Sequence, residues 1–128
     1  MKPIKLNIKP ISVNQAHSVR GRIYKSSTYN SFEEHVRFLL FSKPIPKFSK
    51  GSKLKLSAIF AVSVKFDLDN CVKTFLDVLE PIYQFNDRDI EEIHIRKQRC
   101  KRGEEFIEFT LTELGIDPVE SFFKSNRS

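Results

Sequence analysis

The residue types best suited to chemistry lie near the middle of this 128-residue chain. Asp67 and Asp69 are separated by a single residue, and Lys73 follows four residues after Asp69. Closely spaced carboxylates often hold Mg²⁺ or Mn²⁺, because these hard cations prefer oxygen ligands and keep waters that a phosphate can replace. An ion held in this way activates water and stabilises negative charge on phosphate oxygens. The pattern therefore indicates metal-dependent hydrolysis of a phosphodiester.

A third carboxylate is expected from the segment that follows the next helix. The candidates are Asp87, Asp89, Glu91 and Glu92. We expect the intervening helix to return this segment, and Asp87 first, toward Asp67 and Asp69. Three acids at one site repel each other unless a cation is present, and that repulsion is the source of metal affinity.

Two elements must position these side chains. Residues 54–66 alternate apolar and polar, which predicts a long, half-buried strand. Extending its pleat through Asp67 and Asp69 places both carboxylates on the polar face. A helix over about 70–82 follows, apolar around most of its circumference, so we expect it in the core or against a second subunit. Lys73 then lies one helical turn beyond Asp69.

The remaining pattern predicts one α+β domain over residues 1–128, with a mixed β-sheet packed against two main helices. Ser31 is expected to cap the first helix, and Pro44 to follow its end. The other expected elements are a first strand within 1–11, a basic loop at 43–53, two strands at 90–99 and 105–113 with a hairpin-type connection at 101–104, and a loose tail at 121–128.

Charge is distributed unevenly along the chain. The net charge is +6, yet residues 1–66 sum to +11 and residues 67–128 to −5. A basic half suits a polyanion, because Lys and Arg displace counterions condensed on phosphates. The basic residues expected in loops and at DNA phosphates are Arg20, Arg22, Lys25, Lys43, Lys47, Lys50 and Lys53.

Several classes of protein are disfavoured by the sequence. It has no run of 18 apolar residues that would span a membrane and no apolar signal segment at its start. Cys71 and Cys100 have no metal-type or redox-type spacing, which is typical of free thiols in the cytoplasm. We therefore expect a cytoplasmic protein.

Two other interpretations of the carboxylates remain open at this point. Asp69 or Asn70 could simply cap the helix of a non-catalytic, basic DNA-binding protein. The segment 64–70 is also similar to the first motif of haloacid-dehalogenase-type phosphatases. About 60 residues follow Asp69, too few for the repeated β–α sheet of such phosphatases, so that alternative is weaker.

Three segments together resemble the RusA family of Holliday junction resolvases: Phe66–Lys73, Asp77–Leu79 and Phe85–Ile90. The first contains the D-x-D-N-x-x-K signature of the family, and the resemblance extends over most of the chain, from about Ile4 to Glu113. It also includes Pro10–Asn14 and Arg20–Lys25 near the N-terminus.

The resemblance implies a homodimeric, bacterial or phage-encoded endonuclease that uses Mg²⁺ or Mn²⁺ to nick two opposed strands of a four-way DNA junction in recombination and repair. By position, Asp67, Asp69 and Asp87 are the metal ligands, and Lys73 is the lysine needed for cleavage. Asp89 stands where the family commonly has Gln, so it remains the alternative to Asp87.

Overall fold

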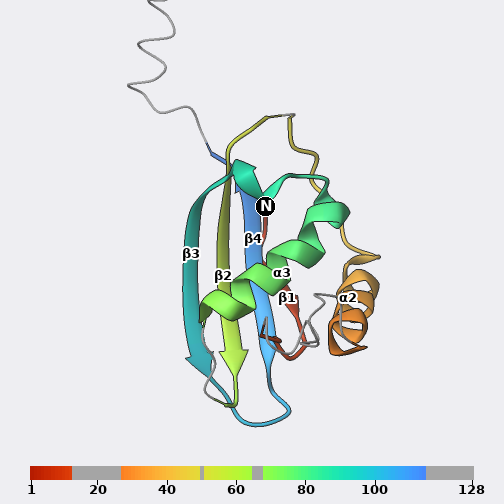
Figure 1. Ribbon diagram of the computed structural model, residues 1–128, viewed down its shortest axis with the longest axis vertical. Helices are drawn as coiled ribbons and strands as arrows, with labels where there is room; N and C mark the ends of the chain where they lie inside the picture. Colours follow the sequence, from red (N-terminus) through yellow and green to blue (C-terminus); the bar gives the residue numbers. More distant parts are fainter. Residues whose placement is uncertain (13–26, 50, 65–67, 115–128) are drawn as a thin grey trace, which may run out of the picture.

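The computed structural model describes residues 1–12, 27–49, 51–64 and 68–114 (Figure 1). The described elements, in chain order, are β1 (Ile4–Leu6), α2 (Ser27–Leu40), β2 (Leu54–Val62), α3 (Leu68–Tyr83), the 3-10 turn η1 (Asp87–Asp89), β3 (Ile90–Arg99) and β4 (Phe106–Glu113). The four strands form one mixed sheet, which confirms the α+β class with two main helices. The tail predicted at 121–128 lies outside the described residues.

The sheet has the order β1-β4-β2-β3, so β2 lies inside it. β2 pairs in parallel with β3 from Leu54↔Ile90 to Val62↔Arg99, and it pairs antiparallel with β4 on its other side. The prediction of a hairpin between β3 and β4 is therefore wrong. The chain does reverse there, with Gly103 at φ 93°, but β2 separates the two strands. The physical reason is burial: β2 is buried or half-buried throughout, whereas most of β3 is polar and exposed.

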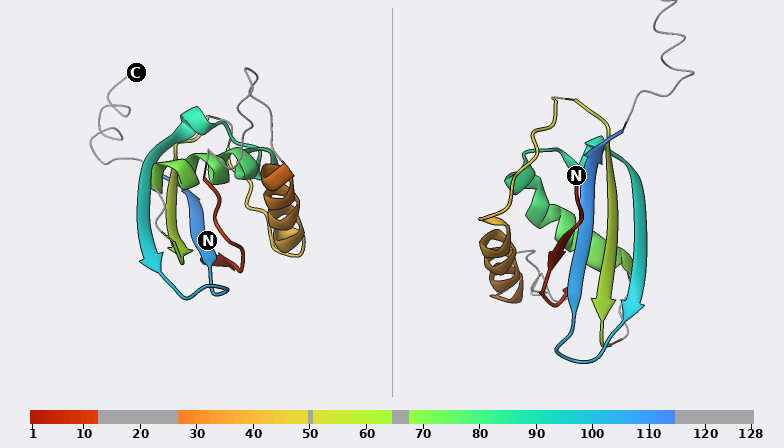
Figure 2. Two further views of the ribbon diagram at one scale, coloured as in Figure 1. Left: turned by 60° about the horizontal axis from the view of Figure 1, so that its bottom comes forward. Right: turned by 180° about the vertical axis from the view of Figure 1, so that it is seen from behind.

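Helix α3 covers one face of the sheet, crossing it obliquely (Figure 1). Its Phe75 ring packs edge-on against Phe60 of β2 and Phe109 of β4, with ring centroids 5.8 and 5.0 Å apart. All three side chains are fully buried. The opposite face of the sheet carries no helix in the described part of the chain (Figure 2). The core is therefore a single layer between the sheet and its helices.

The first helix begins earlier than the sequence suggested. α2 starts at Ser27, and Ser31 is an exposed residue inside it rather than its cap. The apolar stripe explains the earlier start, because Tyr29 precedes Phe32, Val36 and Leu40 at helical spacing and all four are buried. α2 ends at Leu40, before Pro44, and the described residues of the basic segment, 43–49 and 51–53, lie outside helices and strands, as predicted.

The strand that was expected to carry the carboxylates is also shorter. β2 ends at Val62, whose carbonyl accepts a hydrogen bond from the N–H of Cys100 at 3.1 Å. Beyond this point β3 has ended and the chain is turning toward β4, so the pairing on both sides of β2 stops. Asp69 is consequently the second residue of α3 and not a strand residue. The prediction that Asp69 continues the pleat of the strand is therefore wrong.

Candidate active site

A groove of about 420 Å³ runs between α3 and the outer strand β3. Its apolar walls are Val72 and Leu76 of the helix and Ile93 and Ile95 of the strand. Its polar side chains are Lys73, Asp77 and Asp87. The groove therefore brings together two of the predicted catalytic residues, Lys73 and Asp87, from positions 14 residues apart in the sequence.

Helix α3 presents Lys73 and Asp77 on one side, because residues four apart are neighbours on a helix surface. Lys73 is exposed and Asp77 is half-buried. The charge of Asp77 also acts on Tyr29 of α2. Burial of Tyr29 makes the largest contribution to its raised pKa, followed by the charge of Glu33 and then that of Asp77. Together these effects raise the pKa of Tyr29 to about 12. Tyr29 is a buried core residue of α2, so the charge of Asp77 is felt in the core behind α3.

Asp87 is held in place by its immediate neighbours. Asn86 caps the η1 turn, and its side-chain oxygen accepts a hydrogen bond from the N–H of Arg88 at 3.1 Å. The N–H of Asp87 itself donates to Oε1 of Glu80 at 3.2 Å. The first bond is internal to the turn, and the second connects the turn to the last part of α3, so the backbone of Asp87 is held beside the helix.

The acidic residues that follow Asp87 do not line the groove. Glu91 pairs with Lys53 at 3.6 Å, and Glu92 lies 3.7 Å from the imidazole of His94. Asp89 is a half-buried residue of the η1 turn. Of the two alternatives left open by the sequence, Asp87 is the one that lines the groove.

Asp67 lies outside the described residues, and Asp69 is placed only by its backbone, in the first turn of α3. The backbone of Asp87 is bonded to Glu80, which lies eleven residues after Asp69 in α3. Eleven residues of helix correspond to about 16 Å of axial rise. Within the described part of the chain, no three His, Cys, Asp or Glu side chains are grouped closely enough to hold a metal ion. Asp77 and Asp87 do supply oxygen donors that suit Mg²⁺ or Mn²⁺, and further ligands would be needed to complete such a site.

The parallel pairing of β2 and β3 explains this separation. In a parallel β–α–β unit the second strand starts at the same end of the sheet as the first, and the helix spans the distance between. Asp87 therefore returns to the Leu54 end of β2, not to the Val62 end from which the chain continues toward Asp69. The helix thus carries Asp87 away from Asp69, and the prediction that it returns Asp87 toward Asp69 is wrong for this chain.

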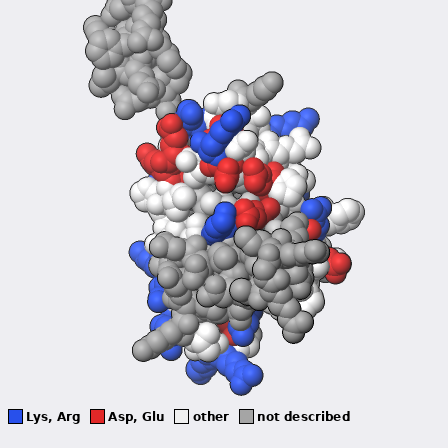
Figure 3. Space-filling view, in the orientation of Figure 1, with Lys and Arg blue, Asp and Glu red and all other residues white. Residues whose placement is uncertain are grey.

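The predicted DNA-binding residues fall into two groups. Lys43, Lys47 and Lys53 are exposed in the connection between α2 and β2. The other four, Arg20, Arg22, Lys25 and Lys50, lie outside the described residues. On the face that carries α3, acidic side chains gather toward the upper part of the view with basic side chains among them (Figure 3).

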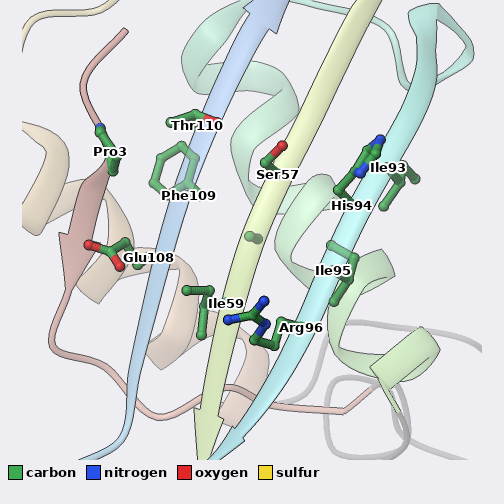
Figure 4. Close-up of a pocket in the computed structure, with 11 residues that line it drawn as sticks. Pro3, Ser57, Ile59, Ile93, His94, Ile95, Arg96, Glu108, Phe109 and Thr110 are labelled. Atoms are coloured by element: carbon green, nitrogen blue, oxygen red, sulfur yellow. The ribbon is translucent and has the colours of Figure 1, made fainter.

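A second hollow, of about 700 Å³, lies against β2, β3 and β4 and shares Ile93 and Ile95 with the groove (Figure 4). Its polar side chains include His94 and Arg96 of β3 and Glu108 of β4. It is larger than the groove, yet none of the predicted catalytic residues lines it. Chemistry is therefore better placed in the smaller groove beside α3.

The fold and groove define an α+β protein with carboxylates and an ammonium group gathered at one edge of a mixed sheet. The sequence profile of the family described as Endodeoxyribonuclease RusA matches residues 7–109, which is most of the chain. This protein belongs to the RusA family, and membership implies the nuclease activity of a Holliday junction resolvase. No curated protein matches the chain significantly. No helix among the described residues is long and apolar enough to cross a membrane.

Three residues near the site were not assigned a role there from the sequence: Asp77, Glu80 and Asn86. Asp77 had a usable signal, since it follows Lys73 by four residues on the polar stripe of the helix. The contacts of Glu80 and Asn86 with the η1 turn had no such signal, because the conformation of that turn decides them.

Proposed function

We propose that this protein is a divalent-metal-dependent endonuclease that acts as a homodimer and resolves four-way DNA junctions by paired symmetric nicks, in recombination and repair. The observation that carries the proposal is the groove shared by Lys73 and Asp87 in a chain of the RusA family. The groove lies between α3 and β3, the outer strand of the sheet. A homodimer suits the reaction because two symmetric cuts need two equivalent sites.

The roles of the residues follow from their chemistry. Asp67, Asp69 and Asp87 are the proposed ligands of Mg²⁺ or Mn²⁺, which when bound supplies charge stabilisation and an activated water. Lys73 is exposed and lines the same groove as Asp87, so its ammonium group can contact the phosphate that gains negative charge in the transition state. Asp77, half-buried four residues later on the same helix, is proposed to orient that ammonium group.

DNA binding is assigned to the basic loops. Lys43 and Lys47 are exposed between α2 and β2, and Arg20, Arg22, Lys25 and Lys50 are proposed to extend the same phosphate-binding surface. Such contacts position the DNA without reading its sequence. Lys53 contributes less to this surface, because Glu91 already lies 3.6 Å from its ammonium group.

The deciding experiment incubates the purified protein with a synthetic four-way junction and with a linear duplex of the same sequence, in Mg²⁺, Mn²⁺ or EDTA. We expect paired nicks in opposed strands of the junction, only with the metal ion present, and little cleavage of the duplex. A junction left intact under all metal conditions contradicts the proposal. Binding that persists without cleavage in any condition would instead identify a non-catalytic DNA-binding protein.

A further inference from the structure

The solvent-facing side of α2 ends in two exposed aromatic rings, Phe38 and Phe41, which we call the aromatic pair. Phe38 is 77% exposed and Phe41 is 89% exposed, the highest values among the large apolar side chains of the described residues. Every other phenylalanine that the structure describes is buried or half-buried. One exposed apolar side chain is common on a protein surface, but two neighbouring rings leave a contiguous apolar area in water. Packing of the core does not account for this pair.

The backbone holds the two rings next to each other. The N–H of Phe41 donates a hydrogen bond to the carbonyl of Phe38 at 3.3 Å, so the chain keeps turning for one more residue after α2 ends at Leu40. Residues three apart on such a turn are neighbours, with about 5–6 Å between their Cβ atoms. The N–H of Lys43 then donates to the carbonyl of Leu40 at 3.0 Å, and the Leu40 side chain is buried in the core. The aromatic pair is therefore presented by an anchored turn.

The surroundings of the aromatic pair are basic. Residues 35–66 contain seven Lys and Arg and no Asp or Glu. Lys43 and Lys47 are exposed just after the pair, whereas Arg37 is engaged by Glu33 at 3.6 Å. A partner that complements this surface carries flat apolar faces together with negative charge.

An unpaired nucleotide of DNA has both properties. Its base stacks on an aromatic side chain whatever the sequence, because every base has a π-face, and its phosphate is attracted to nearby lysines. Bases inside an intact duplex already stack on one another, so they do not offer these faces. A lipid surface fits less well, because the same side of α2 carries the exposed polar residues Ser31 and Glu34, and an interfacial helix needs a continuous apolar face.

The aromatic pair is separate from the groove. α2 lies at the β1 side of the sheet, whereas the groove that holds Lys73 and Asp87 lies between α3 and the outer strand β3 (Figure 2). Neither ring of the pair lines that groove. Contacts made by the pair therefore affect how DNA is bound and leave the groups in the groove unchanged.

We propose that Phe38 and Phe41 bind unpaired bases of DNA by stacking, while Lys43 and Lys47 contact the adjacent phosphates. The choice of DNA as the nucleic acid rests on the proposed function. The stacking surface stands on the exposure of the two rings, the turn that holds them and the basic residues beside them. It gives the protein a preference for DNA that has a single-stranded segment over fully paired duplex.

Fluorescence of the Phe41→Trp variant tests stacking directly. The chain contains no Trp, so the variant has a single indole, placed at the proposed contact. In EDTA, which prevents metal-dependent cleavage, a single-stranded oligonucleotide is expected to quench the indole emission, and a blunt duplex of the same length should quench it little. Heparin is the matched control for charge, because it is a polyanion without bases, and it should not quench. Emission that stays unchanged as the single strand binds overturns the proposal.

Paired substitutions separate stacking from simple apolar contact. Phe38→Leu combined with Phe41→Leu keeps apolar surface but removes both rings, and it is expected to weaken single-strand affinity about ten-fold or more. Phe38→Tyr combined with Phe41→Tyr keeps both rings and should bind nearly as the wild type does. Ile45→Ala is the matched control, since Ile45 is 51% exposed in the same connection and its loss should leave single-strand affinity unchanged. Wild-type single-strand affinity in the double leucine variant contradicts stacking.

The same variant identifies other occupants of this surface. Phosphatidylserine vesicles that shift the emission of Phe41→Trp to shorter wavelength would indicate a lipid-binding surface. Emission that changes with protein concentration in the absence of DNA would indicate a contact between two copies of the chain. Either result, without quenching by the single strand, overturns base stacking.

Failure of this proposal is distinguishable from failure of the proposed function. If the junction and the duplex bind but the single strand leaves the indole emission unchanged, only the stacking surface is excluded. If no form of DNA binds, the proposed function fails as well. In cleavage assays the double leucine variant should keep the wild-type kcat at saturating junction, because neither ring lines the groove.

Discussion

The backbone N–H of Asp87 donates a hydrogen bond to Oε1 of Glu80, with 3.2 Å between nitrogen and oxygen. Glu80 belongs to α3, and Asp87 opens the η1 turn that leads into β3. The bond thus connects the two walls of the groove at the position of a proposed metal ligand. Glu80 has a positioning role, since it holds the backbone of Asp87 rather than the substrate.

Glu80→Ala is expected to lower kcat for junction cleavage about ten-fold or more, because loss of one positioning contact near the reacting groups typically has effects of this size. Junction affinity should change little, since the substrate does not contact Glu80. Glu80→Gln keeps an acceptor oxygen and should recover most of the activity. A variant that alters junction affinity but not kcat would exclude the positioning role.

Asp87→Asn is expected to abolish cleavage, because it removes a proposed ligand of the metal ion. Junction binding should persist or strengthen, because a negative charge facing phosphate is removed. Gel-shift titration and nicking assays on one preparation separate the two effects. Asp89→Asn is the matched control, two residues away in the same turn, and it should keep most of the activity. If Asp89→Asn is the inactive variant, Asp89 rather than Asp87 is the metal ligand.

Lys47→Gln is expected to weaken junction binding and to reduce the slope of log Kd against log salt concentration by about one, the effect of losing one phosphate contact. Lys47 is exposed in the α2–β2 connection and far in sequence from the groove. kcat at saturating junction should be unchanged. An unchanged salt slope would place Lys47 outside the DNA-binding surface.

Phe75→Ala is expected to lower the free energy of unfolding by about 3–5 kcal/mol, the usual cost of removing a large buried aromatic side chain. Phe75 is fully buried and packs edge-on against two other rings. Phe38→Ala is the control, since Phe38 of α2 is 77% exposed and its loss should change stability little. Urea denaturation of both variants measures the difference.

The carboxylate of Glu105 gives a pH dependence of known sign. Hydrogen bonds lower its pKa: the largest effect comes from its own backbone N–H, followed by the Ser63 hydroxyl at 2.9 Å. Burial opposes these effects in part, and the N–H of Gly103, 2.7 Å away, adds to them. Because the folded pKa lies below the unfolded one, the stabilisation is present above the ordinary Glu pKa of 4.5 and is lost as pH falls through the folded value.

Glu105→Gln should therefore show a flatter loss of stability than the wild type as pH falls from about 5 to below 4. Thermal unfolding across this range measures it. Glu104→Gln is the neighbouring control, on an exposed residue of the same turn, and should follow the wild-type curve. Parallel curves for Glu105→Gln and wild type would contradict the assignment.

Local patterns in the sequence predicted much of the fold because they report on neighbouring residues. The alternation through Leu54–Val62 reflects one buried face, which the structure confirms. The helix predicted to be apolar around most of its circumference buries Cys71, Phe75, Val78 and Leu79 in the core, whereas Val72, Leu76 and Ile82 are only partly buried. The start of α2 was misplaced because Ser31 is a good cap in isolation, whereas burial of Tyr29 extends the helix. Strand pairing was misjudged at β3 and β4, because a reversing turn does not specify which strand lies alongside.

The sequence by itself determined the residue types of the site and the family, since D-x-D-N-x-x-K and a later Asp87 are readable without coordinates. Only the tertiary structure decided which of these residues are neighbours. It put Lys73 and Asp87 in one groove and placed Asp87 about 16 Å along α3 from Asp69. The physical reason is that β2 and β3 run parallel, so the helix between them must cross the sheet from one end to the other.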